Sequence, residues 1–132
     1  MTATFMLDTD TVSFALRGQG RVGARIVEHR PTELCVSAIT VAELRYGAAR
    51  RKSAKLHELI DAFTGNVAIM PFDEGGALQF GRIASELAGL GSPIGEFDVL
   101  IAAHAVSLAL TLVTNNVKHF NRVAGLKVEN WL

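Results

Sequence analysis

Short runs of apolar residues recur along the chain, separated by longer segments in which apolar residues repeat at helical spacing. Runs of this length that are apolar throughout are typical of strands buried on both faces of a sheet. We predict strands at residues 4–7, 34–36, 67–70 and 111–114, and an edge strand at 126–128.

The segments between these runs predict helices, and polar or glycine residues mark several of their ends. The predicted helices span residues 9–16, 22–30, 38–46, 53–63, 73–90 and 96–110. Gly18 and Gly20 separate the first two, and Ser37 is positioned to cap the third. The sequence Gly91-Ser92-Pro93 is expected to end the fifth.

The alternation of strands and helices predicts an α/β fold in a single domain over residues 1–132. Short apolar strands joined by helices favour a central, mainly parallel sheet covered by helices on both faces. In such folds ligands bind beyond the carboxyl ends of the strands. The polar residues that follow the predicted strands, namely Asp8, Glu43, Asn115 and Asn116, are therefore expected at one edge of the sheet.

Composition agrees with a globular domain and adds little direction of its own. Apolar residues make up 49% of the 132 residues and charged residues 20%, which excludes a disordered or fibrous chain. There are 13 basic and 13 acidic residues, so the net charge does not indicate binding to nucleic acid or to a membrane. A local basic rim is nevertheless enough to bind nucleic acid.

The single cysteine, Cys35, lies in an apolar run and is expected to be a buried, unreactive thiol. One cysteine cannot form an internal disulfide, which fits a reducing cytoplasm. Residues 99–117 carry no Asp, Glu, Lys or Arg, but they include His, Ser, Thr and Asn. A buried helix followed by a strand is therefore favoured over a membrane span. We expect a cytoplasmic protein without a secretory signal.

Glu43 is one of three acidic residues without a basic residue placed to neutralise it, since Arg45, two residues later, points to another side of the helix. The apolar positions on its predicted helix, which we expect to form the buried face, are Ile39, Ala42, Tyr46 and Ala49. Glu43 lies beside that face, and the residue one turn later is a glycine, which cannot neutralise it.

Asp98 and Asp8 share this feature. The residues one turn after Asp98 are apolar, and no Lys or Arg occurs from residue 83 to 117. Asp8 has no basic residue near it before Arg17. A partly buried carboxylate is costly unless it is paired or bound to a cation.

Each acid taken alone has an ordinary structural explanation. Asp8 or Asp10 could cap the following helix. Glu43 could be solvated, and Asp98 could interact favourably with the helix dipole. Gathered at one edge, however, the three acids would repel one another, and a divalent cation would relieve both the repulsion and the cost of burial. Oxygen ligands without His or Cys favour Mg²⁺ or Mn²⁺.

The blocks of sequence around these acids resemble those of a known family. They are residues 5–10 (FMLDTD), 37–47 (SAITVAELRYG), 93–95 (PIG) followed by Asp98 and 101–105 (IAAHA), 111–116 (TLVTNN), and 120–131. In this order, and over nearly the whole chain, they resemble PIN-domain ribonucleases, specifically the VapC-type toxins of bacterial type II toxin–antitoxin pairs.

The resemblance implies a three-layer α/β/α domain that cuts RNA, such as tRNA or another RNA with single-stranded loops, using Mg²⁺ or Mn²⁺. It also implies a homodimer and a small VapB-like antitoxin that covers the active site, in a heterotetramer or larger assembly. Asp8 and Asp98 would hold the ion, and Glu43 would hold it or orient the attacking water. Further candidates for the site are Asp10, Thr9, Thr114, Asn115 and Asn116.

Two positions depart from the family pattern. Asp10 stands where the family often has Asn, and Asn116 stands where many PIN domains carry a fourth acid. The number of bound ions, one or two, is therefore left open.

Two alternative functions are considered. An apolar strand followed by Asp8-Thr9-Asp10 also resembles a haloacid-dehalogenase-type phosphatase with Asp8 as the nucleophile. Such enzymes need a lysine followed by an acidic pair, whereas Glu129 is the sole acid after Lys118. The other alternative, a non-catalytic protein that only binds its antitoxin, is disfavoured because all three acids are present.

Other polar residues are given structural interpretations. For the basic cluster Arg50-Arg51-Lys52 a solvated helix end is favoured, with phosphate contact as the alternative. His104 is expected to be buried or to support the site rather than act as a catalytic base. His119 lies near the edge of the sheet, where contact with a substrate is the less favoured interpretation.

Overall fold

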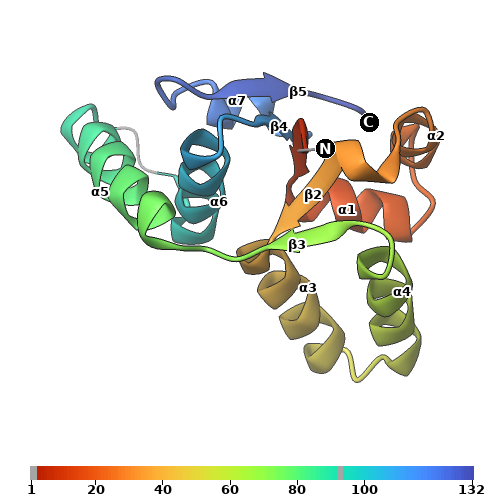
Figure 1. Ribbon diagram of the computed structural model, residues 1–132. Helices are drawn as coiled ribbons and strands as arrows, with labels where there is room; N and C mark the ends of the chain where they lie inside the picture. Colours follow the sequence, from red (N-terminus) through yellow and green to blue (C-terminus); the bar gives the residue numbers. More distant parts are fainter. Residues whose placement is uncertain (1–2, 92–93) are drawn as a thin grey trace.

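The computed structural model describes residues 3–91 and 94–132, and at its centre is a five-stranded sheet (Figure 1). The strands are β1 (Phe5–Leu7), β2 (Leu34–Ser37), β3 (Ala68–Met70), β4 (Thr111–Val113) and β5 (Lys127–Glu129), in the order β3-β2-β1-β4-β5. Every neighbouring pair is parallel. The predicted α/β class and the late edge strand are confirmed.

Helices connect the strands and begin close to the predicted positions. They are α1 (Thr9–Leu16), α2 (Val22–Val27), α3 (Ala38–Arg50), α4 (Ala54–Thr64), α5 (Glu74–Gly89), α6 (Glu96–Ser107) and α7 (Val117–Phe120), with a 3-10 turn at Pro31–Glu33. Several begin with a side chain that accepts a backbone N–H, namely Asp8, Ser37, Ser53 and Asp73. The predicted cap at Ser37 is among them.

Side chains of the strands alternate between two hydrophobic cores, one on each face of the sheet. Met6 and Leu112 belong to the core beneath α5 and α6. Leu7 and Val113 belong to the core beneath α1, α3 and α4. All four side chains are fully buried. The three-layer α/β/α arrangement implied by the family resemblance is therefore confirmed.

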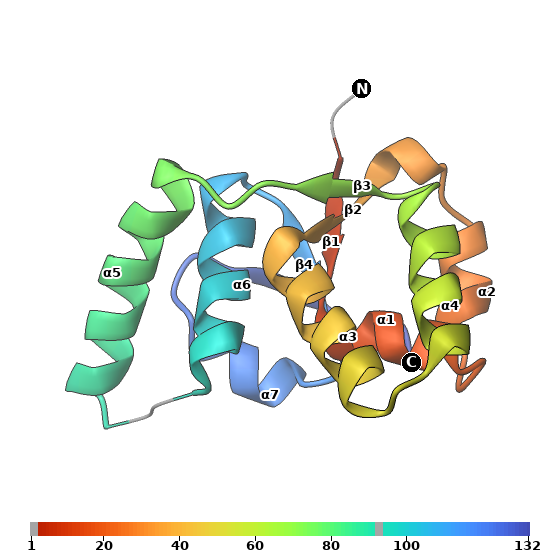
Figure 2. The same cartoon turned by 90° about the horizontal axis from the view of Figure 1, so that it is seen from below.

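The strand order creates a crevice beside the central strand. From β1 the chain moves outward to β2 and β3, and it then crosses to β4 on the other side of β1. A switch of this kind leaves space beyond the carboxyl ends of the two central strands, where ligands bind in open α/β sheets. Figure 2 shows α1, the start of α6 and α7 near this end of β1.

Several helical segments differ from the prediction. Helix α2, predicted over residues 22–30, ends at Val27, and α3, predicted over 38–46, continues to Arg50. The helix predicted to reach residue 110 ends at Ser107, because Ala109 has a φ of +56°, in the left-handed region that a helix cannot continue through. Helix α7 was not predicted, since its four residues are too few to show a periodic pattern. The predicted stop at Gly91-Ser92-Pro93 lies partly outside the described residues, and α5 ends before it.

The buried face of α3 also differs from the prediction. The fully buried side chains of the helix are Thr40, Leu44 and Ala48. Of the predicted face, Ala42, Tyr46 and Ala49 are exposed, and Ile39 packs at the edge of a core. The helix packs through a row of residues spaced four apart. Counting apolar positions along the sequence could not tell this row from the neighbouring one that was predicted. Glu43 still lies beside the buried row.

Cys35 is buried in the sheet, as predicted, and burial raises the pKa of its thiol to about 12. Such a thiol stays protonated and unreactive at neutral pH. No helix among residues 3–91 and 94–132 is long and apolar enough to cross a membrane.

The two-core arrangement predicts a large difference between two leucine-to-alanine substitutions. Leu112→Ala should lower the free energy of unfolding by about 2–5 kcal/mol, because it leaves a cavity in a strand buried on both faces. Leu78→Ala, at a side chain that is 73% exposed, should change it by less than about 0.5 kcal/mol. Urea unfolding followed by circular dichroism measures both, and equal losses would contradict this placement of the core.

Candidate active site

Asp8 directly follows the central strand and is held from several sides. Its backbone N–H donates to the Val113 carbonyl at 3.0 Å, which extends the pairing of β1 with β4. Its Oδ1 accepts the backbone N–H of Thr11 at 2.8 Å and so caps α1. The capping role that the sequence suggested is real, but it occupies part of the carboxylate only.

The carboxylate of Asp8 is almost fully buried, with 3% of the residue exposed. Burial raises its pKa from the ordinary value to about 6, although hydrogen bonds from Thr114 and Thr11 lower it. The charge of Asp10 raises it further. A proton is therefore favoured on this group below about pH 6, and at neutral pH a cation would relieve the cost of its buried charge.

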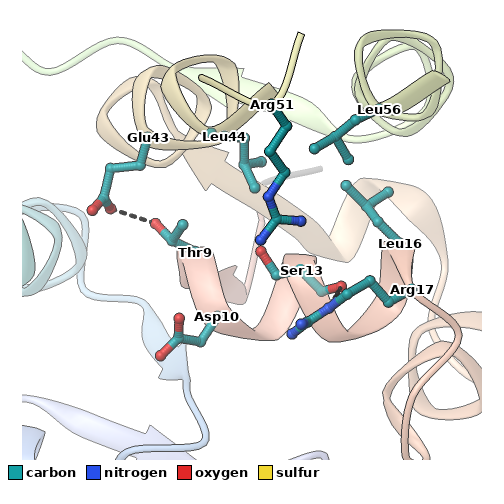
Figure 3. Close-up of a pocket in the computed structure, with 10 residues that line it drawn as sticks. Thr9, Asp10, Ser13, Leu16, Arg17, Glu43, Leu44, Arg51 and Leu56 are labelled. Atoms are coloured by element: carbon teal, nitrogen blue, oxygen red, sulfur yellow. Dashed lines mark hydrogen bonds between the residues drawn. The ribbon is translucent and has the colours of Figure 1, made fainter. Parts of the chain in front are cut away.

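Glu43 reaches the same region from α3 and is half-buried. The Thr9 hydroxyl donates to its Oε1 at 2.6 Å, as Figure 3 shows. Burial raises the pKa of Glu43, the Thr9 hydrogen bond lowers it, and the charges of Asp98 and Asp10 raise it. The contact ties the residue after Asp8 to the second acid, so that α1 and α3 position the two together.

Asp98 lies in the first turn of α6, as expected for an acid near the positive end of the helix dipole. Burial raises its pKa, and the charge of Asp10 also raises it. The His119 imidazole lowers it, since Nε2 lies 3.5 Å from Asp98 Oδ2. The absence of a nearby Lys or Arg in the sequence therefore did not mean the absence of every basic partner.

The contact of His119 with Asp98 was missed from the sequence. His119 lies on α7, which follows β4 at the same edge of the sheet, and without that helix its direction could not be inferred. The available signal was its position five residues after Thr114, at the end of a strand that neighbours β1. Among the described residues, neither Lys nor Arg forms an ion pair with the three acids.

Asp10 is exposed and is the acid whose charge reaches all the others. It raises the pKa of Asp8, Glu43 and Asp98. Figure 3 shows Asp10 and Glu43 at the same end of one pocket, on either side of Thr9. The structure thus brings the sequence-predicted acids into one electrostatic neighbourhood.

The remaining candidates occupy different positions. Thr114 is fully buried, and its hydroxyl accepts the backbone N–H of Asn116 at 2.9 Å. Asn115 and Asn116 are exposed, and within the part of the chain that the structure describes their side chains make no hydrogen bond to the acids. Thr114 therefore supports Asp8, whereas the two asparagines lie at the rim.

A buried hydrogen bond connects the helices that carry Glu43 and Asp98. Ser37 Oγ accepts the backbone N–H of Ile39 and lies 2.8 Å from Nδ1 of His104 on α6. His104 is buried, as predicted, and burial lowers the pKa of its imidazole. Its Nε2 has no hydrogen-bond partner among the described residues, and the backbone of Pro71 partly offsets the lowering of the ring pKa. The contact fixes α6 against the start of α3, and with it the spacing of the two acids.

The carboxylates at this site are the ligands that a hard divalent cation prefers. The groups that converge are carboxylates with raised pKa values and without Lys or Arg partners. Within residues 3–91 and 94–132, no three His, Cys, Asp or Glu side chains lie close enough to surround one ion. Mg²⁺ does not require this, because it keeps several waters and is held by one or two carboxylates together with substrate phosphates.

Comparison with known proteins agrees with this arrangement. Residues 5–126 match the PIN domain family. The chain is 34% identical to the tRNA(fMet)-specific endonuclease VapC of Salmonella typhimurium over 128 residues, 96% of this chain and 97% of the relative. It is 38% identical to Ribonuclease VapC2 of Haemophilus influenzae over 129 residues, 97% of this chain and 98% of the relative. This chain belongs to the VapC family of PIN-domain proteins.

A solved structure extends the likeness to the whole VapC fold. The chain superposes with a TM-score of 0.90 and 32% identity on a chain in the structure of VapBC2 from Rickettsia felis bound to a DNA fragment from their promoter. The alignment covers 98% of this chain and 99% of that one. The resemblance that the ordered sequence blocks suggested is therefore confirmed.

The raised pKa of Asp8 predicts that the acid destabilises the cation-free PIN domain. Its pKa in the folded state is about 6, above the ordinary 3.8, so the contribution of Asp8 to stability is most favourable below about pH 4 and is lost as the pH rises through 6. Asp8→Asn keeps the shape without the charge. It should raise the free energy of unfolding by about 3 kcal/mol at pH 7.5 in EDTA, and by much less at pH 4.

Urea unfolding of both proteins at the two pH values measures this difference. Excess Mg²⁺ should reduce the advantage of the variant at pH 7.5, because the cation stabilises only the chain that binds it. An advantage that is the same at pH 4 and pH 7.5 would show that ionisation of Asp8 is not its cause.

Proposed function

We propose that this chain is a Mg²⁺- or Mn²⁺-dependent ribonuclease toxin that hydrolyses phosphodiester bonds in RNA. The observation that carries the proposal is the convergence of Asp8, Glu43 and Asp98 from three elements, each with a raised pKa and without a Lys or Arg partner. Burial of these acids lowers the stability of the fold, and binding of a cation is a function that accounts for their retention at the site. The names of the VapC relatives, a ribonuclease and a tRNA endonuclease, support RNA as the substrate.

In the proposed reaction the three acids have separate tasks. A bound divalent cation supplies the positive charge that activates water and stabilises the scissile phosphate. Asp8 and Asp98 would hold the cation, and Glu43 would contribute a ligand or accept a hydrogen bond from the attacking water. The Thr9 hydroxyl keeps Glu43 in one rotamer through its 2.6 Å hydrogen bond. His119 holds the Asp98 carboxylate in place.

The RNA class is inferred from the relatives. The Salmonella typhimurium protein is named as specific for tRNA(fMet) and shares 34% identity over nearly the full length. We therefore expect tRNA, with initiator tRNA as the first to test, and an action in the cytoplasm where tRNA is found.

A protein partner is expected for the same reason. The Rickettsia felis structure contains VapBC2, a complex, with promoter DNA. We propose a VapB-like antitoxin that covers the active site, with this chain as a homodimer in a heterotetramer or larger assembly.

The phosphatase alternative is disfavoured by the surroundings of Asp8. With 3% of the residue exposed and Oδ1 engaged in capping α1, Asp8 has one oxygen left, which can ligate a small cation but has no open path to the phosphorus atom of a substrate. The non-catalytic alternative leaves the raised pKa values of three converging acids unexplained.

Charge-removing substitutions test the enzyme proposal. Glu43→Gln and Asp98→Asn should each lower the rate of tRNA cleavage by roughly 100-fold or more, because each removes a group that holds the cation or the water. Glu58→Gln, on the exposed side of α4, is the matched control and should cleave like the wild type. Cleavage is followed by gel analysis of tRNA in Mg²⁺, and near-normal cleavage by Asp98→Asn would exclude the proposed mechanism.

The pH dependence of cation binding gives a second test. Protons and Mg²⁺ compete for Asp8, whose pKa is about 6, so the affinity for Mg²⁺ should fall as the pH drops below 6. Titration calorimetry of the wild type at pH 5 and pH 7.5 measures the change. Equal affinities at both pH values would mean that Asp8 does not hold the ion.

A further inference from the structure

The pocket that holds Glu43 and Asp10 continues away from the acids toward two arginines. It has a volume of about 280 Å³ and lies between α1 and α3. Thr9, Asp10 and Glu43 line one end, and Arg17 and Arg51 line the other (Figure 3). The catalytic site proposed above therefore has a basic extension.

Arg17 is held in place by its own helix. Its Nε donates to the Ser13 carbonyl at 3.3 Å, and its guanidinium carbon lies 5.3 Å from the centre of the Phe14 ring. These contacts use one edge and one face of the guanidinium group. The terminal nitrogens are left to donate to another group.

Arg51 enters the same pocket from the opposite wall. It follows the last residue of α3, and Figure 3 shows its side chain extending toward Ser13 on α1. Within the described ranges neither Arg51 nor Arg17 forms an ion pair with a carboxylate. Two guanidinium groups in one pocket without an acid between them repel each other, and an anion would relieve that repulsion.

We propose that Arg17 and Arg51 form a binding site for a backbone phosphate of the RNA, next to the phosphate that is cleaved. The proposal rests on the ribonuclease function proposed above. It assigns these residues to positioning the substrate and gives them no part in the chemical step.

The charge pattern along the pocket favours a nucleic acid strand over an acidic peptide. Asp10 and Glu43 at the other end repel any anion unless a divalent cation lies between, and Mg²⁺ held by one or two protein carboxylates typically takes substrate phosphates as further ligands. An RNA strand can place one phosphate beside the cation at the acidic end of the pocket and another between the arginines at the basic end. Arg51, the residue that caps the end of α3, is eight residues after Glu43, about 12 Å of helix rise. Arginine side chains lean toward the helix N-terminus, which shortens this span.

The test measures RNA binding apart from cleavage. All variants carry Asp98→Asn, so that bound RNA is not cut, and the probe is a fluorescent single-stranded oligoribonucleotide in Mg²⁺. Arg17→Gln and Arg51→Gln should each weaken binding roughly fivefold. Each should also lower the slope of log affinity against log salt concentration by about 0.7.

Two matched variants separate this site from a general effect of charge. Arg50→Gln removes the same charge one residue earlier on α3, outside the pocket, and should change affinity by less than about twofold. Arg51→Lys keeps the charge and should keep the salt slope while weakening binding. Thermal unfolding of each variant verifies that the fold is retained.

A neutral methylphosphonate, moved along the oligonucleotide one linkage at a time, identifies the phosphate concerned. One position should weaken binding of the Asp98→Asn chain and have no further effect in Arg51→Gln, because the two changes remove the same contact. Additive effects at every position, or equal losses from Arg50→Gln and Arg51→Gln, would overturn the proposal.

Failure of this site and failure of the ribonuclease function give different results. Wild-type cleavage of tRNA together with unaltered binding by both arginine variants would overturn the phosphate site alone. A wild-type chain that neither binds nor cleaves RNA would overturn both. Loss of antitoxin binding with unchanged RNA binding would assign the arginines to a protein partner and overturn the proposal.

Discussion

A buried carboxylate without a cationic side chain as a partner is the constraint on which the rest of this site depends. Asp8 follows the central strand, and the sheet and α1 enclose it almost completely. Packing that would suit an apolar side chain therefore raises the pKa of this acid to about 6. The cost is opposed by hydrogen bonds from Thr11 and Thr114 and is removed when a proton or a cation binds. The fold is thus less stable than it would be with a neutral residue here, a trade-off found where function requires it.

Two contacts between distant segments hold the other acids in place around Asp8. The Thr9 hydroxyl fixes Glu43, and the buried pair of Ser37 and His104 fixes α6 against the start of α3. Buried polar contacts of this kind are sensitive to geometry, because a lost partner leaves an unsatisfied group. These two contacts explain how α1, α3 and α6, which are far apart in the sequence, bring their acids to one region. The proposed phosphate site lies between α1 and α3, the helices that the contact of Thr9 with Glu43 joins, so this contact would help to position both the acids and the arginines.

Much of the fold could be predicted because the relevant patterns are local. Apolar runs gave the strands to within a residue or two, and caps such as Ser37 marked helix starts. The short α7 was missed, because four residues show no period. The prediction of the buried face of α3 was wrong, because small residues, alanine among them, lie on both faces of the helix. Contact with α1, α4 and the sheet, rather than the hydrophobicity of the helix itself, determined which face packed.

By itself the sequence determined the α/β alternation, the edge of the sheet where polar residues gather, and the acids Asp8, Glu43 and Asp98. The alternation and the edge follow from periodicity along the chain and from the rule that parallel strands share a carboxyl edge. The acids were candidates because no basic residue lies one helical turn away and because the blocks around them resemble those of the family. Only the tertiary structure decided how deeply Asp8 is buried, which base contacts Asp98, and which arginines face the pocket beside Glu43. Those features depend on side-chain packing between segments far apart in sequence, and a local pattern carries no information about it.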